Sequence, residues 1–542
     1  METVPFATWD EANQRFRSPL CCPEPACGEE VVATAAPPAF PIADRCPRCG
    51  RPFERAPIRS EAGAAPMEVT RRLNAGFCTT TGQELTQPSP LDWGEAGGGP
   101  GRTGCLPDPR GAFFGRPNAN IAINARQSWS EHGVFGPDRD GADPVRSVIV
   151  VRGRLIVTSA GGRTAVLRTE DGSSVLPRGE CLEWPDGTAD ATNEDRSVSH
   201  TVAVRAGHLC IGAGHQFVVR DIREYLGRPS ALGRSVGWMD ASEGRRFFGP
   251  PLGIDAERPL FAVLEGVEDG VRDADGGIRE PVIRIMDGTG AEVSRIGAPG
   301  ISRPPVYDRL NQVLIWVTDT GSVNTVPLGQ LSHEGSQTVT SDPGGEFYIG
   351  FDPRPTLIVA PNSAGRAELW LADGSTEGGS FTIRCALLHP RVNQPERPWR
   401  WKERAYEASA HIAGFAVGIG SRSGHDAASD LIGVTSLEGV FGLQKSNEGV
   451  LRRDFTASEL SGSFRGSADP PILCSAGLIA RTNMGIYVHS APLGWSQDPG
   501  TASVRLPGNY RRRQGLAMLG RRVFVGHGTG VTAIDLEPRG SS

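Results

Sequence analysis

The chain has 542 residues, with 70 glycines, 43 prolines and a formal net charge of -6. This length excludes a single hydrophobic core, because such cores stop growing near ~250–300 residues, and the glycine and proline content excludes a long helical bundle. The mild charge gives no electrostatic footprint for nucleic acid or for an anionic membrane. The length, the glycine and proline content, and the net charge are all compatible with a β protein with many turns.

Two pairs of cysteines near the N-terminus form the most specific motif in the sequence. They are Cys22, Cys27, Cys46 and Cys49. Each pair stands in a C-P…C-G frame, and thiolates at this spacing can close a tetrahedral zinc site. We therefore predict a zinc-ribbon module over residues 1–60 that binds one structural zinc ion. The C-P frame favours Cys22 as a ligand, although its neighbour Cys21 could take its place.

Other roles for this module are less favoured. A redox role for Cys46 and Cys49 would need a surrounding βαβ pattern, which the sequence lacks. Residues 1–60 contain eight acidic residues and seven arginines, so their charge is balanced and we do not expect nucleic-acid binding. Four thiolates would leave no open coordination position, so the metal is expected to be structural.

The segment before the repeats has little periodicity. Residues 61–145 include the breaker-rich stretch 87–104, with the run G-G-G-P-G, and we expect a linker with an irregular layer that packs on the next domain. The first twenty residues lack a basic region and an apolar stretch, and no run in the chain reaches the ~18–20 apolar residues of a membrane span. We expect a soluble cytoplasmic protein without membrane contact.

From residue 146 to residue 542, short apolar runs alternate with turn residues. Six of these runs close at an aspartate, namely Asp171, Asp221, Asp287, Asp319, Asp373 and Asp535. The first four gaps between them average about 50 residues, and the last gap, of 162 residues, is about three such periods. A period of about 50 residues is typical of a four-stranded propeller blade, whereas a β-sandwich unit would be about 100 residues long. The sequence thus predicts a mainly β fold with a β-propeller over 146–542. Seven blades are favoured, with eight as the alternative.

Few residues in the repeats point to chemistry. The chain has no H-E-x-x-H, no P-loop and no G-x-S-x-G in a strand-to-helix setting, and turn chemistry explains the Asp-Gly pairs. We interpret His208, Cys210 and His215 as ordinary strand and turn residues. The segment P-W-R-W-K-E-R-A-Y, which begins at Pro398, is either a partner-binding loop or the cover of a sheet edge or of a seam between blades. We predict no catalytic or cofactor-binding residues and predict that the chain is not an enzyme.

Two resemblances extend this interpretation. Repeats such as G-T-G-V-T-A-I-D-L, which ends at Leu536, resemble the blades of quinoprotein-type (PQQ-like) propellers over residues 146–542. The cofactor and metal site of those enzymes has no motif here, so the resemblance implies their fold alone. A zinc ribbon followed by a propeller is also similar to the propeller components of bacterial ternary systems, which act with a MoxR-type AAA ATPase and a von Willebrand A protein.

The second resemblance implies a non-catalytic protein–protein interaction scaffold or target-recognition subunit, with an AAA ATPase or a von Willebrand A protein as its partner. The alternative is an enzyme, a hydrolase or lyase, with a pocket at the central channel of the propeller. Convergent ionisable side chains in the channel would favour the enzyme, and an apolar or plugged channel with an exposed aromatic patch would favour the scaffold.

Overall fold

The structure of the chain is a computed structural model that describes its strands and the turns next to them. The described residues are 8–10, 15–21, 30–35, 53–58, 67–72, 98, 102, 104–105, 123–135, 143–151, 153–160, 163–176, 202–205, 207–213, 215–222, 236–254, 259–267, 280–308, 311–328, 331, 339–341, 356–361, 367–374, 381–388, 399–401, 406–408, 412–418, 431–436, 439–444, 452–456, 469–474, 477–482, 485–489, 501–504, 506 and 515–538.

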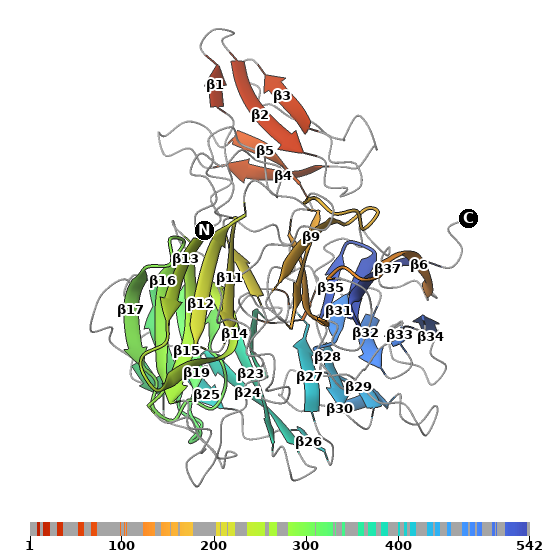
Figure 1. Cartoon of the computed structure of the whole chain (residues 1–542). Helices are drawn as coiled ribbons and strands as arrows, with labels where there is room; N and C mark the ends of the chain where they lie inside the picture. The colour runs from red at the N-terminus through yellow and green to blue at the C-terminus, as the bar shows by residue number, and fades with distance from the viewer. Residues whose placement is uncertain are drawn as a thin grey trace.

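The described residues form β-strands and turns and no α-helix, which confirms the predicted mainly β fold (Figure 1). Within this part of the chain, no helix has the length and apolarity needed to cross a membrane. The N-terminal strands make two small sheets, which pair with no other strand among the described residues. Their strands are β1 (Thr8–Asp10), β2 (Arg15–Cys21) and β3 (Glu30–Ala35) in one sheet, and β4 (Phe53–Ile58) and β5 (Met67–Arg72) in the other.

The remaining strands form a series of antiparallel sheets along the chain. The first sheet contains β7 (Val145–Val151), β8 (Arg154–Ser159) and β9 (Thr164–Arg168). The second contains β10 (Val202–Arg205), β11 (His208–Ala213), β12 (Gln216–Asp221) and β13 (Val236–Asp240). The third contains β14 (Arg245–Ile254), β15 (Leu260–Val267), β16 (Val282–Asp287) and β17 (Glu292–Gly297). The fourth contains β18 (Val306–Asp308), β19 (Val313–Val317), β20 (Val323–Pro327) and β21 (Val339–Ser341).

Four more sheets complete the series. The fifth contains β22 (Leu357–Pro361), β23 (Ala367–Gly374), β24 (Phe381–Leu388) and β25 (Trp399–Trp401), and β26 (Tyr406–Ala408) also pairs with β24. The sixth contains β27 (Ile412–Val417), β28 (Leu431–Ser436), β29 (Gly439–Gln444) and β30 (Arg452–Thr456). The seventh contains β31 (Ile472–Cys474), β32 (Gly477–Thr482), β33 (Gly485–His489) and β34 (Thr501–Val504). The eighth contains β35 (Leu516–Leu519), β36 (Arg522–His527), β37 (Gly530–Pro538) and β6 (Ile123–Glu131).

The eight sheets form a closed ring. The first strand of each sheet contacts the first strand of the next, in the order β7, β10, β14, β18, β22, β27, β31, β35 and back to β7. These first strands are therefore the innermost strands of the ring. The sequence favoured seven blades and allowed eight, and the described strands form eight such sheets.

The ring is closed by a strand from the N-terminal side of the repeats. In Figure 1, β6 lies beside β37, and the two strands pair in antiparallel register from Ile123↔Pro538 to Glu131↔Val531. Residues 61–145 were expected to hold a linker and an irregular layer, and the structure shows that this stretch also contains the fourth strand of the last sheet.

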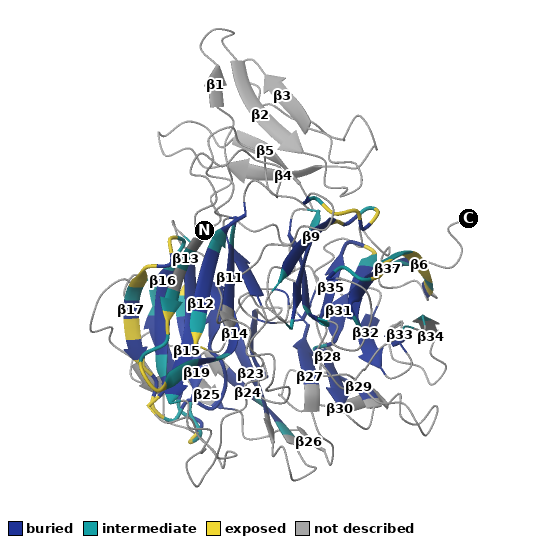
Figure 2. Ribbon diagram, viewed as in Figure 1, coloured by how far each residue is buried: buried dark blue, intermediate teal, exposed yellow. Residues whose placement is uncertain are grey.

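The hydrophobic core is divided among the interfaces between neighbouring sheets (Figure 2). One cluster joins Ile149 and Val166 of the first sheet to Val204 of the second, and another joins Leu264 of the third sheet to Trp316 of the fourth. A sheet inside such a ring buries both of its faces, so its inner strands are continuous apolar runs rather than alternating ones. In β7 the run V-I-V-V at residues 148–151 has this pattern, with all four residues buried.

Turn chemistry closes the hairpins as the Asp-Gly pairs predicted. The Oδ1 atom of Asp171 accepts hydrogen bonds from the backbone N–H and the hydroxyl of Ser173, at 2.9 and 2.7 Å. Asp287 makes the same pair of bonds with Thr289, at 2.9 and 2.6 Å. Gly172 follows with a φ of 75°, a value that glycine adopts without steric cost.

Candidate functional site

The innermost strands surround a short piece of the chain that precedes β6, which we call the axial segment (Arg102, Gly104 and Cys105). The carbonyl of Gly104 accepts a hydrogen bond from the backbone N–H of Leu473 in β31, at 2.8 Å. Cys105 and Leu473 form a parallel β-bridge. On the other side, the Arg102 guanidinium donates to the carbonyl of Pro250 in β14, at 3.1 Å.

These contacts place the axial segment at the centre of the ring. The third sheet, with β14, and the seventh, with β31, are four positions apart in a ring of eight and therefore face each other across it. The Cα atoms of Arg102 and Cys105 can be at most about 11 Å apart, so a segment that touches both sheets must lie between them. Arg102 is 1% exposed and Cys105 7%, which is consistent with a central position.

A buried ion pair lies in the seventh sheet, whose strand β31 holds the axial segment. Asp469 directly precedes Pro470, Pro471 and β31, and its Oδ2 atom lies 3.3 Å from Nη1 of Arg481 in β32. The two side chains are 1% and 3% exposed. Burial lowers the pKa of the Arg481 guanidinium, and the Asp469 carboxylate opposes this shift by stabilising the cation.

Asp469 also connects three neighbouring sheets. Its Oδ1 atom accepts the backbone N–H of Gly515, just before β35, at 2.9 Å, and its carbonyl accepts the hydroxyl of Thr435 in β28, at 3.4 Å. Asp469, at the start of the seventh sheet, thus makes hydrogen bonds with residues of both the sixth and the eighth sheets. Buried ionisable groups near the axis are one of the features expected of a functional channel.

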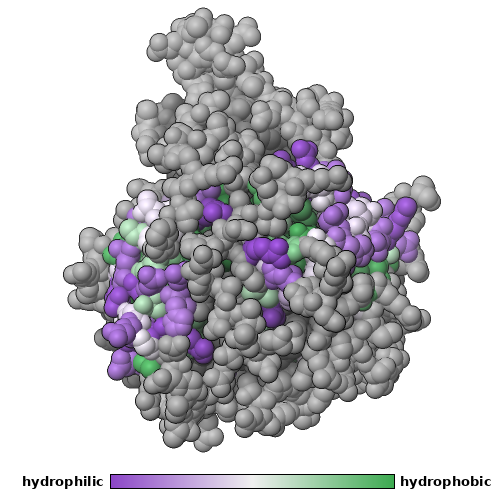
Figure 3. Space-filling view, viewed as in Figure 1, coloured by the Kyte–Doolittle hydropathy of each residue, from purple (hydrophilic) through white to green (hydrophobic). Residues whose placement is uncertain are grey.

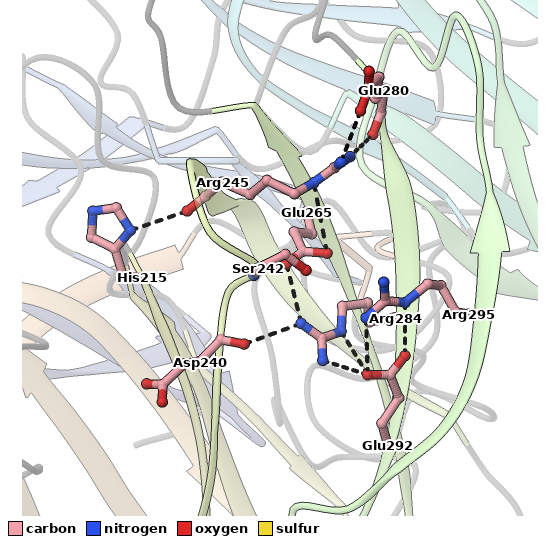
Figure 4. A network of polar contacts seen from close by, with 9 residues as sticks. All are labelled: His215, Asp240, Ser242, Arg245, Glu265, Glu280, Arg284, Glu292 and Arg295. Atoms are coloured by element: carbon pink, nitrogen blue, oxygen red, sulfur yellow. Dashed lines mark hydrogen bonds and ion pairs between the residues drawn. The ribbon is translucent and has the colours of Figure 1, made fainter.

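A second polar cluster lies in the third sheet (Figure 4). At its centre is Glu265 of β15, whose side chain is fully buried. Its Oε1 atom accepts the backbone N–H of Ser242 at 2.6 Å and Nη1 of Arg284 at 3.1 Å. Its Oε2 atom has no hydrogen-bond donor among the described residues, and Nε of Arg245 in β14 is 4.0 Å from it.

The arginines of this cluster bind further acidic groups. Arg284 of β16 donates Nε to Oε2 of Glu292 at 3.0 Å and Nη1 to the carbonyl of Asp240 in β13 at 3.1 Å. Glu292 of β17 also accepts Nε of Arg295 at 3.0 Å. The cluster joins β15, β16 and β17 to the end of the second sheet.

Three carboxylates and three guanidinium groups balance each other in this cluster, the remaining pair being Arg245 and Glu280 at 3.0 Å. Each of these carboxylates is paired with a guanidinium group, and these pairs stabilise the join between two sheets. The surface over this sheet is mainly hydrophilic on the face seen in Figure 3.

Glu292 gives the cluster a defined dependence on pH. Partial burial opposes ionisation, but hydrogen bonds from Arg295 and Arg284 outweigh it and lower the pKa of Glu292 from its ordinary value of 4.5. Ionised Glu292 therefore stabilises the fold above that value, and this contribution is lost as the pH falls through the lowered pKa. We expect Glu292→Gln to have a lower Tm than the wild type at pH 7, with the difference shrinking below roughly pH 4. A Tm difference that stayed constant from pH 3 to pH 7 would contradict this assignment.

The residues predicted from the sequence fall into two groups. The four cysteines of the expected zinc site, Cys22, Cys27, Cys46 and Cys49, lie outside the described residues. Among the described residues no group of three or more His, Cys, Asp or Glu side chains could hold a metal ion. Cys210 is buried in β11, and Nδ1 of His215 bonds the carbonyl of Arg245 at 3.0 Å, which agrees with their interpretation as ordinary residues.

The structure places one tryptophan of the Trp-Arg-Trp segment in a seam. Trp401 is 6% exposed and packs among the side chains between the fourth and fifth sheets. Its indole N–H donates to the carbonyl of Gly321 at 2.8 Å, in the turn between β19 and β20. For Trp401, the cover of a seam is therefore the correct alternative.

Comparisons with known proteins identify the fold. No family model and no curated protein matches the chain. The ring of antiparallel sheets is a β-propeller, a fold that it shares with solved quinohemoprotein alcohol dehydrogenases. The solved structure of a quinohemoprotein alcohol dehydrogenase from Comamonas testosteroni superposes with a TM-score of 0.51 and 11% identity, over 84% of this chain and 82% of that one. A quinohemoprotein alcohol dehydrogenase from Pseudomonas putida HK5 has a TM-score of 0.48 and 12% identity, over 83% and 81%.

These comparisons correct one prediction. The prediction that the chain is not an enzyme is wrong, because the solved structures with this fold include dehydrogenases. That prediction rested on the absence of familiar catalytic motifs. Because other proteins with this fold are enzymes, the absence of these motifs is not evidence against catalysis. At 11% identity the similarity establishes the fold alone, so it assigns no dehydrogenase activity to this chain.

Proposed function

We propose that the chain is a protein-binding scaffold or target-recognition subunit, built on an eight-bladed propeller that follows an N-terminal zinc-ribbon module in the sequence. We propose that it is located in the cytoplasm. The observation that carries this proposal is the axial segment. The inner strands hold this piece of polypeptide through two hydrogen bonds: the backbone N–H of Leu473 in β31 donates to the carbonyl of Gly104, and Arg102 donates to the carbonyl of Pro250 in β14. Such contacts are the ones by which sheet edges recognise peptides.

The partners we propose are an AAA ATPase or a von Willebrand A protein. Affinity purification of the tagged chain from its native host is expected to recover one of them in an amount comparable to the chain itself. Recovery of no protein above the level of an untagged control, or recovery of nucleic acid instead, would overturn this function.

The proposed zinc site gives a separate prediction. We expect the purified chain to contain about one zinc ion, and the Cys46→Ser/Cys49→Ser double variant to lose it, because four thiolates are needed to close the site. Cys22→Ser should also lose the metal, whereas Cys21→Ser should keep it. Metal analysis of the four proteins decides both points. Equal zinc content in the wild type and the double variant would contradict the site.

A second candidate, a hydrolase or lyase with its pocket at the axis, is supported by the buried pair of Asp469 and Arg481 in the seventh sheet, which holds the axial segment. It predicts turnover of a small molecule by the purified chain. Such turnover should change in Arg102→Ala, whose side chain reaches across the axis. If turnover is present without any recovered partner, the enzyme is the correct candidate.

A further inference from the structure

Among the described strands, β31 pairs only with β32, and its inner edge is occupied by the axial segment of the same chain. β31 pairs with β32 on one side, and on the other side Leu473 pairs with Cys105 of the axial segment. An unpaired strand edge offers main-chain N–H and C=O groups to any extended segment that reaches it. Here the N–H of Leu473 is taken by the carbonyl of Gly104, at 2.8 Å.

The conformation of the axial segment is strained. Arg102 has a φ of 54°, a left-handed value that is unfavourable for a residue with a side chain. Among the described residues only Glu280 and Gln312 share this property without being glycine. The strain favours departure of the segment, while its hydrogen bonds to Leu473 and Pro250 retain it.

The surroundings of the segment define which peptides fit. A Cβ atom on Gly104 would lie 2.5 Å from Cβ of Ala416 and 2.9 Å from the carbonyl oxygen of Pro471, so this position accepts glycine alone. Two residues earlier, the guanidinium of Arg102 reaches the carbonyl of Pro250 on the opposite side of the ring. The site therefore selects an arginine followed two residues later by a glycine.

We propose that the inner edge of β31 is a peptide-binding site, and that the axial segment is its displaceable internal occupant. Its ligand is a segment of a partner protein with the pattern Arg-x-Gly, which takes the left-handed conformation of Arg102 and Gly104, forms the parallel bridge to Leu473 of β31, and donates a guanidinium N–H to the carbonyl of Pro250 in β14. This inference rests on the proposed protein-binding function and names the site and chemistry of the contact. When the partner segment binds, the axial segment leaves the ring.

Departure of the axial segment can be followed through the thiol of Cys105. Cys474 of β31 is the internal reference, since it is also buried but belongs to a blade. Under native conditions we expect a thiol reagent to label Cys105 at least about tenfold faster than Cys474, because release of the segment needs no unfolding of a sheet. Peptide mapping by mass spectrometry measures both rates in the full-length chain.

Two glycine variants test the cause of the labelling. Gly104→Ala introduces the clash with Ala416 and should raise the labelling rate of Cys105 a further tenfold or more, with Cys474 unchanged. Gly244→Ala is the matched control, because Gly244 also has a positive φ, of 71°, but no atom within 4 Å of an added Cβ. If Gly104→Ala does not fold, Arg102→Ala replaces it, because it loses the bond to Pro250 and keeps the glycine. Equal labelling of Cys105 and Cys474 in the wild type and in these variants would overturn the proposal.

Binding in trans is tested with a synthetic peptide of residues 98–107 that has serine at position 105. We expect it to bind Gly104→Ala at least about tenfold more tightly than the wild type, whose own segment competes for the site. A peptide with glutamate in place of Arg102 should not bind. Absence of binding to the variant overturns the site, whereas recovery of a partner by affinity purification would still support the proposed function.

Discussion

Asp469→Ala is expected to destabilise the protein by about 3–5 kcal/mol, one of the two largest effects among the substitutions considered. The change leaves the guanidinium of Arg481, which is 3% exposed, without its counter-charge 3.3 Å away. It also leaves the N–H of Gly515 without the acceptor that it has at 2.9 Å. A buried charge without a partner costs more than the lost attraction, because its desolvation is no longer compensated.

The measurement is the Tm of the variant and its free energy of unfolding in urea. The Asp469→Leu/Arg481→Met double variant is expected to recover a large part of the loss, because it removes both buried charges together. Asp171→Ala is the control, since Asp171 is exposed and its carboxylate bonds Ser173 in its own turn, so its effect should be within about 1 kcal/mol. A loss for Asp469→Ala no larger than that of Asp171→Ala would show that the ion pair contributes nothing to the ring.

The repeated hairpins could be predicted from the sequence because their signals are local. An apolar run, an aspartate and a glycine determine a strand and the turn after it, and Asp171 and Asp287 make the expected bonds. The number of sheets is a weaker inference from the same signals. The last sheet takes only β35, β36 and β37 from the end of the chain, so the spacing of repeats does not give its fourth strand.

The strand β6 shows why such a contribution cannot be predicted from local pattern. Only one of its nine residues, Ile123, is fully buried, and its remaining residues are half-buried or exposed. An outer strand needs one partner and little burial, so it lacks the apolar run that marks the inner strands. Its partner β37 lies at the other end of the chain, and no local pattern relates the two.

The buried charges are unpredictable for a related reason. Arg102, Asp469 and Glu265 have ordinary neighbours in the sequence, and their partners lie 148, 12 and 19 residues away. An arginine in a glycine-rich stretch indicates a solvated loop, whereas the ring buries Arg102 at its centre. The one available signal is the glycine two residues after Arg102, because close packing at the axis requires a residue without a side chain at position 104.

The contact between the first and last sheets combines three side chains. The indole N–H of Trp129 in β6 donates to the carbonyl of Thr169 at 3.2 Å, just after β9. Arg522 of β36 donates to the same carbonyl at 2.8 Å and holds both oxygens of Asp535 in β37, at 2.6 and 3.0 Å. The carbonyl of Thr169 is thus shared by two strands of the closing sheet.

Trp129→Ala is expected to weaken this closure by about 2–4 kcal/mol, slightly less than the loss of a fully buried tryptophan because the side chain is half-buried. The ring of Trp129 fits against Gly172, where an added Cβ would lie 2.7 Å from it, so Gly172→Ala should weaken the same contact from the other side. A ring of sheets opens first where its closing contact is weakest, so hydrogen exchange should accelerate in β6 and β37 and stay slow in β15 and β16.

Glu170→Ala is the matched control for the closure, because the contribution of Glu170 to this contact is its main-chain carbonyl, which accepts Arg522 at 3.0 Å and remains in the variant. We expect its exchange rates in β6 to equal those of the wild type. If Trp129→Ala instead accelerates exchange equally in β6 and β15, the ring unfolds as one unit. The pairing of β6 with β37 would then not be the point at which the ring opens first, because opening would cost as much free energy at this seam as at any other.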